Sequence, residues 1–235
     1  MFKRLHHQRI AQLLQALDGE QLRECRCYFG GGTVIALRYG EYRESLDVDF
    51  LVSDSDGYRQ LRQLIREADS LAPLFHSKQP LFTLARDIRV DQYGIRTSVD
   101  VLGVAIKFEI VFEARMTLAM PEKTDTVCGV PTLTVMDMAA SKLLANSDRG
   151  ADIGVFCRDV IDLAMMNLPL RTLRLAVAKA EQAYGKTVLV DLEKVIQRLA
   201  EKDGLLERCM QAMAVTVPQA VLWQRIRLLK RLLPD

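Results

Sequence analysis

The sequence predicts an α+β half, residues 1–130, followed by an all-α half, residues 131–235. Short β-rich runs separated by glycine turns fill residues 81–112, where no helical period is found. After Pro131, apolar residues recur with the helical period to the end of the chain. No low-complexity linker separates the halves, so we expect them to pack together and to form a cleft.

The expected elements follow in order along the chain. Strands are expected at residues 25–29, 47–52, 88–93, 97–102 and 106–112. Helices are expected at residues 3–17, 33–38, 56–68, 152–166, 170–184, 188–202 and 218–233. Thr134 and Asp137 form a capping box for a further helix through Lys142, the first of the second half.

Composition and charge exclude several classes of protein. Apolar residues make up 49% and charged residues 26%, which is typical of a globular protein. The net charge of +2 excludes a polycation, although residues 223–231 carry four basic residues and no acid. No window approaches the ~20 apolar residues of a membrane span. We therefore expect a cytoplasmic protein without membrane contact, in which the five cysteines are reduced thiols.

A glycine cluster lies between an expected strand and an expected helix. Gly31 and Gly32 precede Thr33 in the run Gly-Gly-Gly-Thr. Glycine adopts positive φ and lets a ligand approach the backbone closely, and amides at a helix N-terminus attract anions. The cluster is therefore either a phosphate-binding turn or a purely structural turn.

Two aspartates open the strand expected at residues 47–52. Asp47 and Asp49 are two residues apart, so in a strand their side chains point to the same face, about 6.5–7 Å apart. Neighbouring carboxylates repel each other, and Mg²⁺ is commonly held by a few carboxylates plus substrate phosphates. The pair indicates a metal site, and the alternative is a strand end with two solvated acids.

A third acid lies in a later strand. Alternation places Lys107 and Glu109 on one face of the strand at 106–112 and the phenylalanines on the other. Neighbouring strands are about 4.8 Å apart, so Glu109 can join Asp47 and Asp49 in one acidic cluster. Asp100, in the preceding strand, competes for this position, and we favour Glu109.

This arrangement resembles the signature of the polymerase-β-like nucleotidyltransferases. That signature is Gly-Gly or Gly-Ser, a helix, Asp-x-Asp on a strand, and a third acid on a later strand. Gly31-Gly32, Asp47-x-Asp49 and Glu109 match it in the same order.

Within that superfamily, residues 31–50 resemble the AbiEii/AbiGii toxin family. In that family a Gly-Gly-Thr helix is followed by Arg and Ser shortly before Asp-x-Asp, and Arg43 and Ser45 occupy those places. The resemblance implies a polymerase-β-like α+β core with a mixed sheet, followed by a C-terminal helical bundle that completes the nucleotide cleft. Glu109 departs from the family pattern, in which Asp is more familiar.

A second block of residues extends the resemblance through Asp137, Lys142, Arg149 and the run Arg158-Asp159-x-x-Asp162. The resemblance implies that Lys142 contacts nucleotide phosphate in the cleft and that Arg158, Asp159 and Asp162 also line the site. The residues alone leave another interpretation open. Lys142 then extends to water, and Arg158 pairs with Asp162 four residues later.

The resemblance also implies the chemistry. Two Mg²⁺ or Mn²⁺ ions would be held by Asp47, Asp49 and Glu109. The glycines and Thr33 would cradle the phosphates of an NTP, with Ser45 beside them. The nucleotide would pass to an acceptor, for which an RNA such as tRNA is one candidate, in a toxin–antitoxin or abortive-infection system with a cognate antitoxin. The alternatives are a small-molecule, antibiotic-type nucleotidyltransferase and a non-catalytic nucleotide-binding or interaction module.

Overall fold

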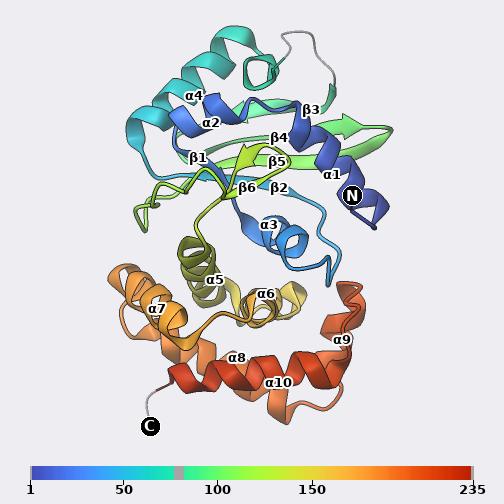
Figure 1. Cartoon of the computed structure of the whole chain (residues 1–235), viewed down its shortest axis with the longest axis vertical. Helices are drawn as coiled ribbons and strands as arrows, with labels where there is room; N and C mark the ends of the chain where they lie inside the picture. Colours follow the sequence, from blue (N-terminus) through green and yellow to red (C-terminus); the bar gives the residue numbers. More distant parts are fainter. Residues whose placement is uncertain (1, 77–81, 234–235) are drawn as a thin grey trace. The chain divides into compact units, whose positions relative to one another are not determined.

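The computed structural model describes residues 2–76 and 82–233, which form two compact units (Figure 1). The first unit comprises Met1–Arg38 with Ser45–Thr134, and the second comprises Tyr39–Glu44 with Val135–Asp235. Leu81, the expected start of the β-rich segment, lies outside the described residues, as do the last two residues of the chain. Strands and helices make up the first unit and helices the second, so the expected α+β class is confirmed.

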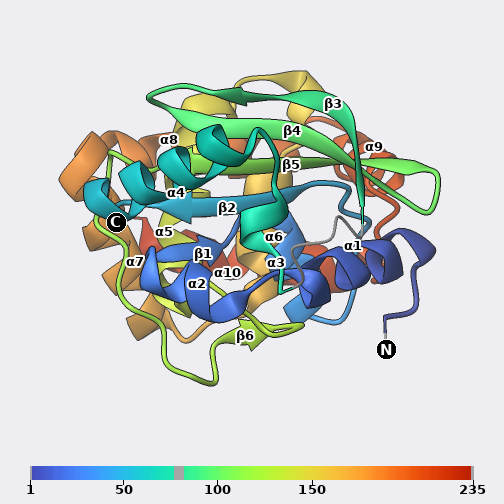
Figure 2. The same ribbon diagram turned by 90° about the horizontal axis from the view of Figure 1, so that it is seen from above.

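A five-stranded sheet of order β1-β2-β5-β4-β3 forms the centre of the first unit (Figure 2). Its strands are β1 (Cys27–Phe29), β2 (Val48–Val52), β3 (Thr83–Val90), β4 (Gly94–Val101) and β5 (Val104–Phe112). β2 and β5 run parallel, and the other neighbours run antiparallel, which confirms the expected mixed sheet. The strands β6 (Thr126–Val127) and β7 (Val130–Pro131) form a separate short ladder.

The two faces of the five-stranded sheet differ in polarity, because side chains alternate along each strand. On one face Phe50 packs between Phe29 and Phe108, with ring centroids 5.5 and 5.7 Å apart. Helix α4 (Ser55–Ala68) covers this face, where Tyr58 stacks on Phe112. Helix α3 (Gly31–Arg38) lies on the opposite side of the sheet (Figure 1). The acidic side chains of β2 and β5 lie on this opposite, more polar face.

Aspartate side chains fix two helix starts in the first unit. Asp54 accepts a hydrogen bond from the amide of Gly57 at the start of α4. Asp18 accepts from two amides at the start of α2 (Gly19–Glu24), a short helix that the sequence pattern does not predict. Helix α1 (Leu5–Ala16) and the 3₁₀ turn η1 (Ala72–Leu74) complete the helical elements described in this unit.

The strand expected at residues 88–93 is wrong in its bounds. β3 ends at Val90, and the Asp91 carboxylate accepts hydrogen bonds from the amides of Tyr93 and Gly94. This side-chain bond closes a tight turn, so the chain reverses three residues earlier than the apolar pattern indicates.

Helices build the second unit around α5 (Val135–Arg149), which packs against α6 (Arg158–Met166), α7 (Leu170–Tyr184) and α8 (Thr187–Glu201). The remaining elements are α9 (Leu205–Ala212), which the sequence pattern does not predict, α10 (Gln219–Leu229) and η3 (Lys230–Leu232). α10 packs against α6. The core of this unit therefore lies between α5 and α6 and the helices that surround them.

The helix expected at residues 152–166 is also wrong in its first part. Residues Ile153–Val155 form the short 3₁₀ turn η2, and Phe156 and Cys157 adopt positive φ of 54° and 52°. Two consecutive left-handed residues cannot belong to an α-helix. The α-helix therefore begins only at Arg158, immediately before the two aspartates that carry the resemblance.

Candidate active site

The glycine turn of the first unit lies directly against Asp49. Gly31 has φ of +69°, and a Cβ at this position would meet the Asp49 Oδ2 atom at 2.5 Å. The amide of Gly30 donates to the Asp49 carbonyl at 2.8 Å, which joins the turn to β2. Only glycine gives this backbone both its conformation and its close approach. The carboxylate of Asp49 is thus held at the N-terminus of α3.

Glu109 is the register partner of Asp49 across the parallel strands β2 and β5. Its carboxylate lies beside two cations, with Lys107 Nζ at 2.7 Å and Arg96 Nε at 3.4 Å. Asp100 lies four residues along β4 from Arg96, and its side chain accepts a hydrogen bond from the amide of Gly103. The parallel register of β2 and β5 therefore makes Glu109 and Asp49 neighbours. Asp100 instead lies at the turn that connects β4 to β5.

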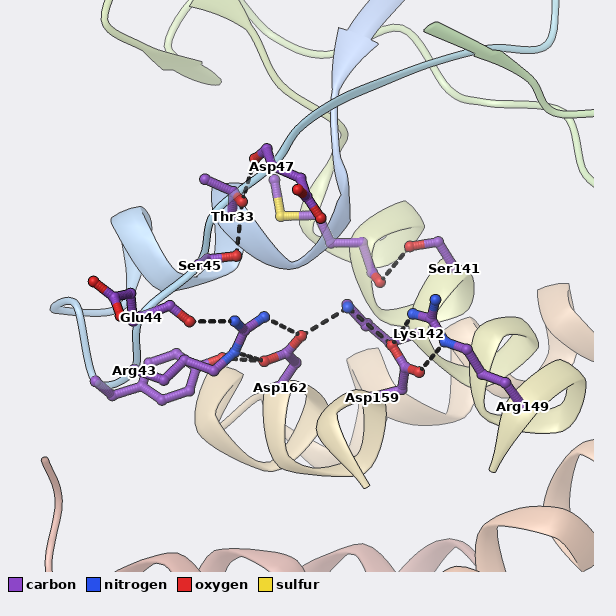
Figure 3. Close-up of polar contacts among 12 residues, drawn as sticks. Thr33, Arg43, Glu44, Ser45, Asp47, Ser141, Lys142, Arg149, Asp159 and Asp162 are labelled. Carbon is purple, nitrogen blue, oxygen red and sulfur yellow. Dashed lines mark hydrogen bonds and ion pairs between the residues drawn. The ribbon is translucent and has the colours of Figure 1, made fainter. Parts of the chain in front are cut away.

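Asp47 lies just before β2, where hydroxyl groups hold its backbone. Thr33 donates to the carbonyl of Asp47 at 2.5 Å, and its oxygen lies 2.7 Å from the Ser45 hydroxyl (Figure 3). Because Thr33 has one hydroxyl proton, Ser45 is the donor in the second bond. The amide of Ser45 donates to the buried His7 Nε2. Thr33 and Ser45 thus fix the loop that leads into Asp47-Val48-Asp49.

The acidic residues of the first unit have the donor chemistry of a divalent-cation site. Burial alone would lower the pKa of Lys107, but its hydrogen bond to Glu109 and the charges of Glu109, Asp49 and Asp47 raise it. One ammonium therefore lies in the field of all three carboxylates, and such oxygen donors suit Mg²⁺. Within residues 2–76 and 82–233, however, no three His, Cys, Asp or Glu side chains surround a single metal position.

The second unit contains a chain of buried ion pairs (Figure 3). Lys142 Nζ lies 3.0 Å from Asp159 Oδ1 and 2.7 Å from Asp162 Oδ2. Arg43 forms a bidentate pair with Asp162, at 2.6 and 2.9 Å, and Arg149 forms one with Asp159, at 2.7 and 2.8 Å. We call these five residues the ion-pair network. α5 supplies Lys142 and Arg149, α6 supplies both aspartates, and the segment Tyr39–Glu44 supplies Arg43.

Burial makes each charge of the ion-pair network dependent on its partners. The side chain of Asp162 is fully buried, and it also accepts a hydrogen bond from Tyr42 at 2.5 Å. Burial alone would raise the pKa of Asp162, but Arg43 and Lys142 more than offset this and hold it below its usual range. Lys142 and Arg149 likewise hold the pKa of Asp159 low against the effect of burial. Both aspartates are therefore ionised at neutral pH.

The ion-pair network contradicts the interpretation in which Lys142 extends to water and Arg158 pairs with Asp162. Lys142 is only 4% exposed, so it does not extend to water, and two carboxylates supply the counter-charge that its apolar sequence neighbours lack. Asp162 pairs with Arg43 and Lys142, and Arg158 makes no ion pair within the described part of the chain. Three cations against two carboxylates leave one excess positive charge.

A model of the family described as "Nucleotidyl transferase AbiEii toxin, Type IV TA system" matches residues 12–225. The chain belongs to this family. The match spans the glycine turn, the acidic strands and the ion-pair network, so the AbiEii resemblance of the sequence is confirmed. The family assignment makes the chain a nucleotidyltransferase of a toxin family.

One solved structure shares the fold of this chain. The Helicobacter pylori protein JHP933 shares 14% identity over 99% of this chain and 95% of its own, with a TM-score of 0.53. A second H. pylori protein, assigned as a nucleotidyltransferase, shares 17% identity over 97% and 94% of the two chains, with a TM-score of 0.48. A search of curated proteins finds no match. At this identity the likeness to JHP933 is one of fold.

Three contacts of the candidate residues are not apparent from the sequence pattern alone. Tyr42 bonds to Asp162 although 120 positions separate them, and Arg149 forms a bidentate pair. Arg96 lies beside Glu109. Arg43 and Arg149 both occupy positions of the family motif, and this is the signal that could have marked them.

Among the described helices, none is long and apolar enough to cross a membrane.

Proposed function

We propose that this AbiEii-family chain transfers a nucleoside monophosphate from an NTP to an acceptor and releases pyrophosphate. The observation that carries the proposal is the pairing of Asp49 with Glu109 against the glycine turn. Two acids on neighbouring parallel strands, at the N-terminus of a helix, provide carboxylates and anion-attracting amides in one place. The family assignment supplies the reaction class.

In the proposal, Asp47, Asp49 and Glu109 hold divalent cations, Mg²⁺ or Mn²⁺. When bound, such ions neutralise phosphate charge and activate the attacking hydroxyl. Gly31 and Gly32 offer backbone amides to the phosphates. Thr33 and Ser45 act by position, because their hydroxyl groups hold the backbone at Asp47.

The second unit contributes positive charge in the proposal. Its ion-pair network carries one more cation than carboxylates, and Arg149 is its most accessible member, with 37% of its side chain exposed. An excess cation in a desolvated site favours an anion such as a triphosphate. Asp159 and Asp162 hold Lys142, Arg43 and Arg149 in place for this contact.

The acceptor that we propose is an RNA such as a tRNA, with a cognate antitoxin as the protein's partner in a type IV system. Support for a polyanionic acceptor comes from the last helical turns, where Lys230 and Arg231 follow Arg227 by three and four positions and all three side chains are exposed. Cations at this spacing share one helix face. Such a face attracts a phosphate backbone.

Labelled NTPs test the proposal and identify the acceptor class. The protein is incubated with each α-labelled NTP, Mg²⁺ and a cellular RNA, protein or small-molecule fraction. We expect label in the RNA fraction. Label only in small molecules would favour an antibiotic-type transferase, and the absence of transfer with all fractions would favour a non-catalytic nucleotide-binding module.

A charge-neutralising pair of variants tests the role of the ion-pair network. Lys142→Met and Arg149→Met each leave two cations and two carboxylates, so each removes the excess positive charge. We expect both to weaken binding of a non-hydrolysable NTP, with a loss of roughly tenfold for a lost charge-assisted contact. Arg59→Met, at a side chain that is 74% exposed on α4, is the control. Unchanged binding in both network variants would remove the second unit from the proposal.

A further inference from the structure

A row of cations lies beside Glu109 on the polar face of the five-stranded sheet. Lys107 of β5 and Arg96 of β4 both contact the Glu109 carboxylate, at 2.7 and 3.4 Å. Arg96 is also the register partner of Glu109, and directly paired residues point to the same face of a sheet. The first two cations of the row therefore border the acids that hold the metal ions in the proposed function.

The edge strand β3 extends this row (Figure 2). Arg89 is the register partner of Arg96, and Arg86 is that of Ser98, so both arginines of β3 point to the polar face. Regular alternation would place two residues that are three positions apart on opposite faces. A register shift between Arg86 and Arg89 brings both onto one face. We call the four cations of this face the basic strip: Lys107, Arg96, Arg86 and Arg89.

The basic strip is accessible to solvent. Arg86, Arg89 and Lys107 are exposed, and Arg96 keeps 35% of its side chain exposed although it contacts two acids. Within the part of the chain that the structure describes, neither arginine of β3 forms an ion pair. The guanidinium groups of β3 are therefore available to an external anion, and arginine binds phosphate through two parallel hydrogen bonds.

We propose that the basic strip binds the phosphate backbone of the acceptor RNA and directs this acceptor to the acids. The inference rests on the proposed function, because it locates the acceptor of that reaction. Neighbouring strands are about 4.8 Å apart, so two strand intervals place the backbone of Arg89 about 10 Å from that of Glu109. An RNA whose attacking hydroxyl lies at the acids then has its neighbouring phosphates within reach of the basic strip. Such backbone contacts position a nucleic acid without reading its sequence.

The strand order separates the basic strip from the glycine turn. Gly31 approaches Asp49 of β2, and α3 packs against the same strand. In the order β1-β2-β5-β4-β3, the acids of β2 and β5 therefore lie between the glycine turn and the cations of β4 and β3. Because the glycine turn receives the NTP phosphates in the proposed function, an anion on the other side of the acids is the acceptor. The basic strip also belongs to the same unit as these acids, whereas the cations of residues 227–231 belong to the other unit.

Fluorescence anisotropy with labelled, unfractionated tRNA and Mg²⁺ tests the basic strip without requiring transfer. The variants are Arg86→Gln and Arg89→Gln, because Lys107 and Arg96 contact Glu109 and their loss would disturb the acids. Each variant should lower the slope of log affinity against log salt by about 0.7–0.9, the contribution of one phosphate contact, which amounts to about five- to eightfold weaker binding at 0.1 M salt. Arg89→Lys should recover most of the loss, since a cation is restored. Arg59→Gln, at a side chain that is 74% exposed on the helix covering the opposite face, is the control and should bind as the wild type.

Transfer assays separate this inference from the proposed function. In both glutamine variants the KM for tRNA should rise, whereas the KM for NTP should stay at the wild-type value. Wild-type affinity and salt slope in Arg86→Gln and Arg89→Gln, or an equal loss in Arg59→Gln, would overturn the role of the basic strip even if label reaches RNA. A wild type that does not bind tRNA would overturn it as well. Binding of tRNA that depends on the basic strip, without transfer from any NTP, would instead reject the proposed function and support the RNA-binding surface.

Discussion

Asp162→Asn removes the fully buried carboxylate of the ion-pair network while keeping its shape. The carboxylate accepts hydrogen bonds from Tyr42 and Arg43 and pairs with Lys142, at 2.5 to 2.9 Å. Removal of one partner from a buried pair costs about 3–5 kcal/mol, since the other charge stays buried. Lys142 keeps Asp159, so we expect the lower end, about 3 kcal/mol. For a chain of this length that corresponds to a fall in Tm of about 6–12 °C.

The single tryptophan makes this measurement specific to the second unit. Trp223 lies in α10, which packs against α6, so its fluorescence reports unfolding around Asp162. Urea unfolding followed by this signal is compared with that of Asp56→Asn, the control. Asp56 and Arg59 form an exposed pair, for which at most about 0.5 kcal/mol is expected. A loss in Asp162→Asn no larger than that of the control would refute the account of the ion-pair network.

Two further predictions follow from the same contacts. Gly31→Ala should destabilise the protein by about 1–2 kcal/mol through its positive φ, and it should also abolish transfer because the new Cβ displaces the Asp49 carboxylate. Gly40 also has a positive φ, of +85°, but open space surrounds it, so Gly40→Ala is the control that carries the backbone cost alone. Equal transfer by Gly31→Ala and Gly40→Ala would argue against the Asp49 contact. The second prediction concerns pH. The pKa of Asp162 is lower in the folded protein than in the unfolded chain, where it is about 3.9. The Asp162 carboxylate therefore stabilises the fold above about pH 3.9, and this stabilisation is lost as the pH falls through the folded-state pKa. The difference in urea stability between wild type and Asp162→Asn should therefore shrink below about pH 4, and a difference that grew on acidification would contradict the assignment.

Local periodicity predicts which side chains of β2 and β5 lie on the polar face of the sheet, but not which strands are neighbours. Asp49 and Glu109 share a face because alternation fixes side-chain direction, and a parallel register then makes them neighbours. The choice between Glu109 and Asp100 depends on the order β2-β5-β4, which alternation within one strand does not contain. The end of β3 was misplaced because the Asp91 side chain, rather than the apolar pattern, determines where the chain turns.

The ion-pair network was less predictable because its partners come from distant segments. Lys142 is surrounded by apolar residues in the sequence, yet α6 provides both of its carboxylates. Arg43 reaches Asp162 from a segment more than a hundred positions away. The break before α6 depends on two residues with positive φ, and neither Phe156 nor Cys157 is a residue type that marks such a conformation.

The central claim is that Asp49 serves the transfer of a nucleotide rather than of a phosphate. The most direct measurement compares α-labelled with γ-labelled NTP in the presence of Mg²⁺ and the acceptor fraction, for the wild type and for Asp49→Asn. The account predicts that the wild type incorporates only the α-label and releases the γ-label as pyrophosphate. It predicts that Asp49→Asn incorporates neither label, while it unfolds at the same or a higher urea concentration because one charge leaves an acidic cluster. Incorporation of the γ-label, or full activity of Asp49→Asn, would contradict the account.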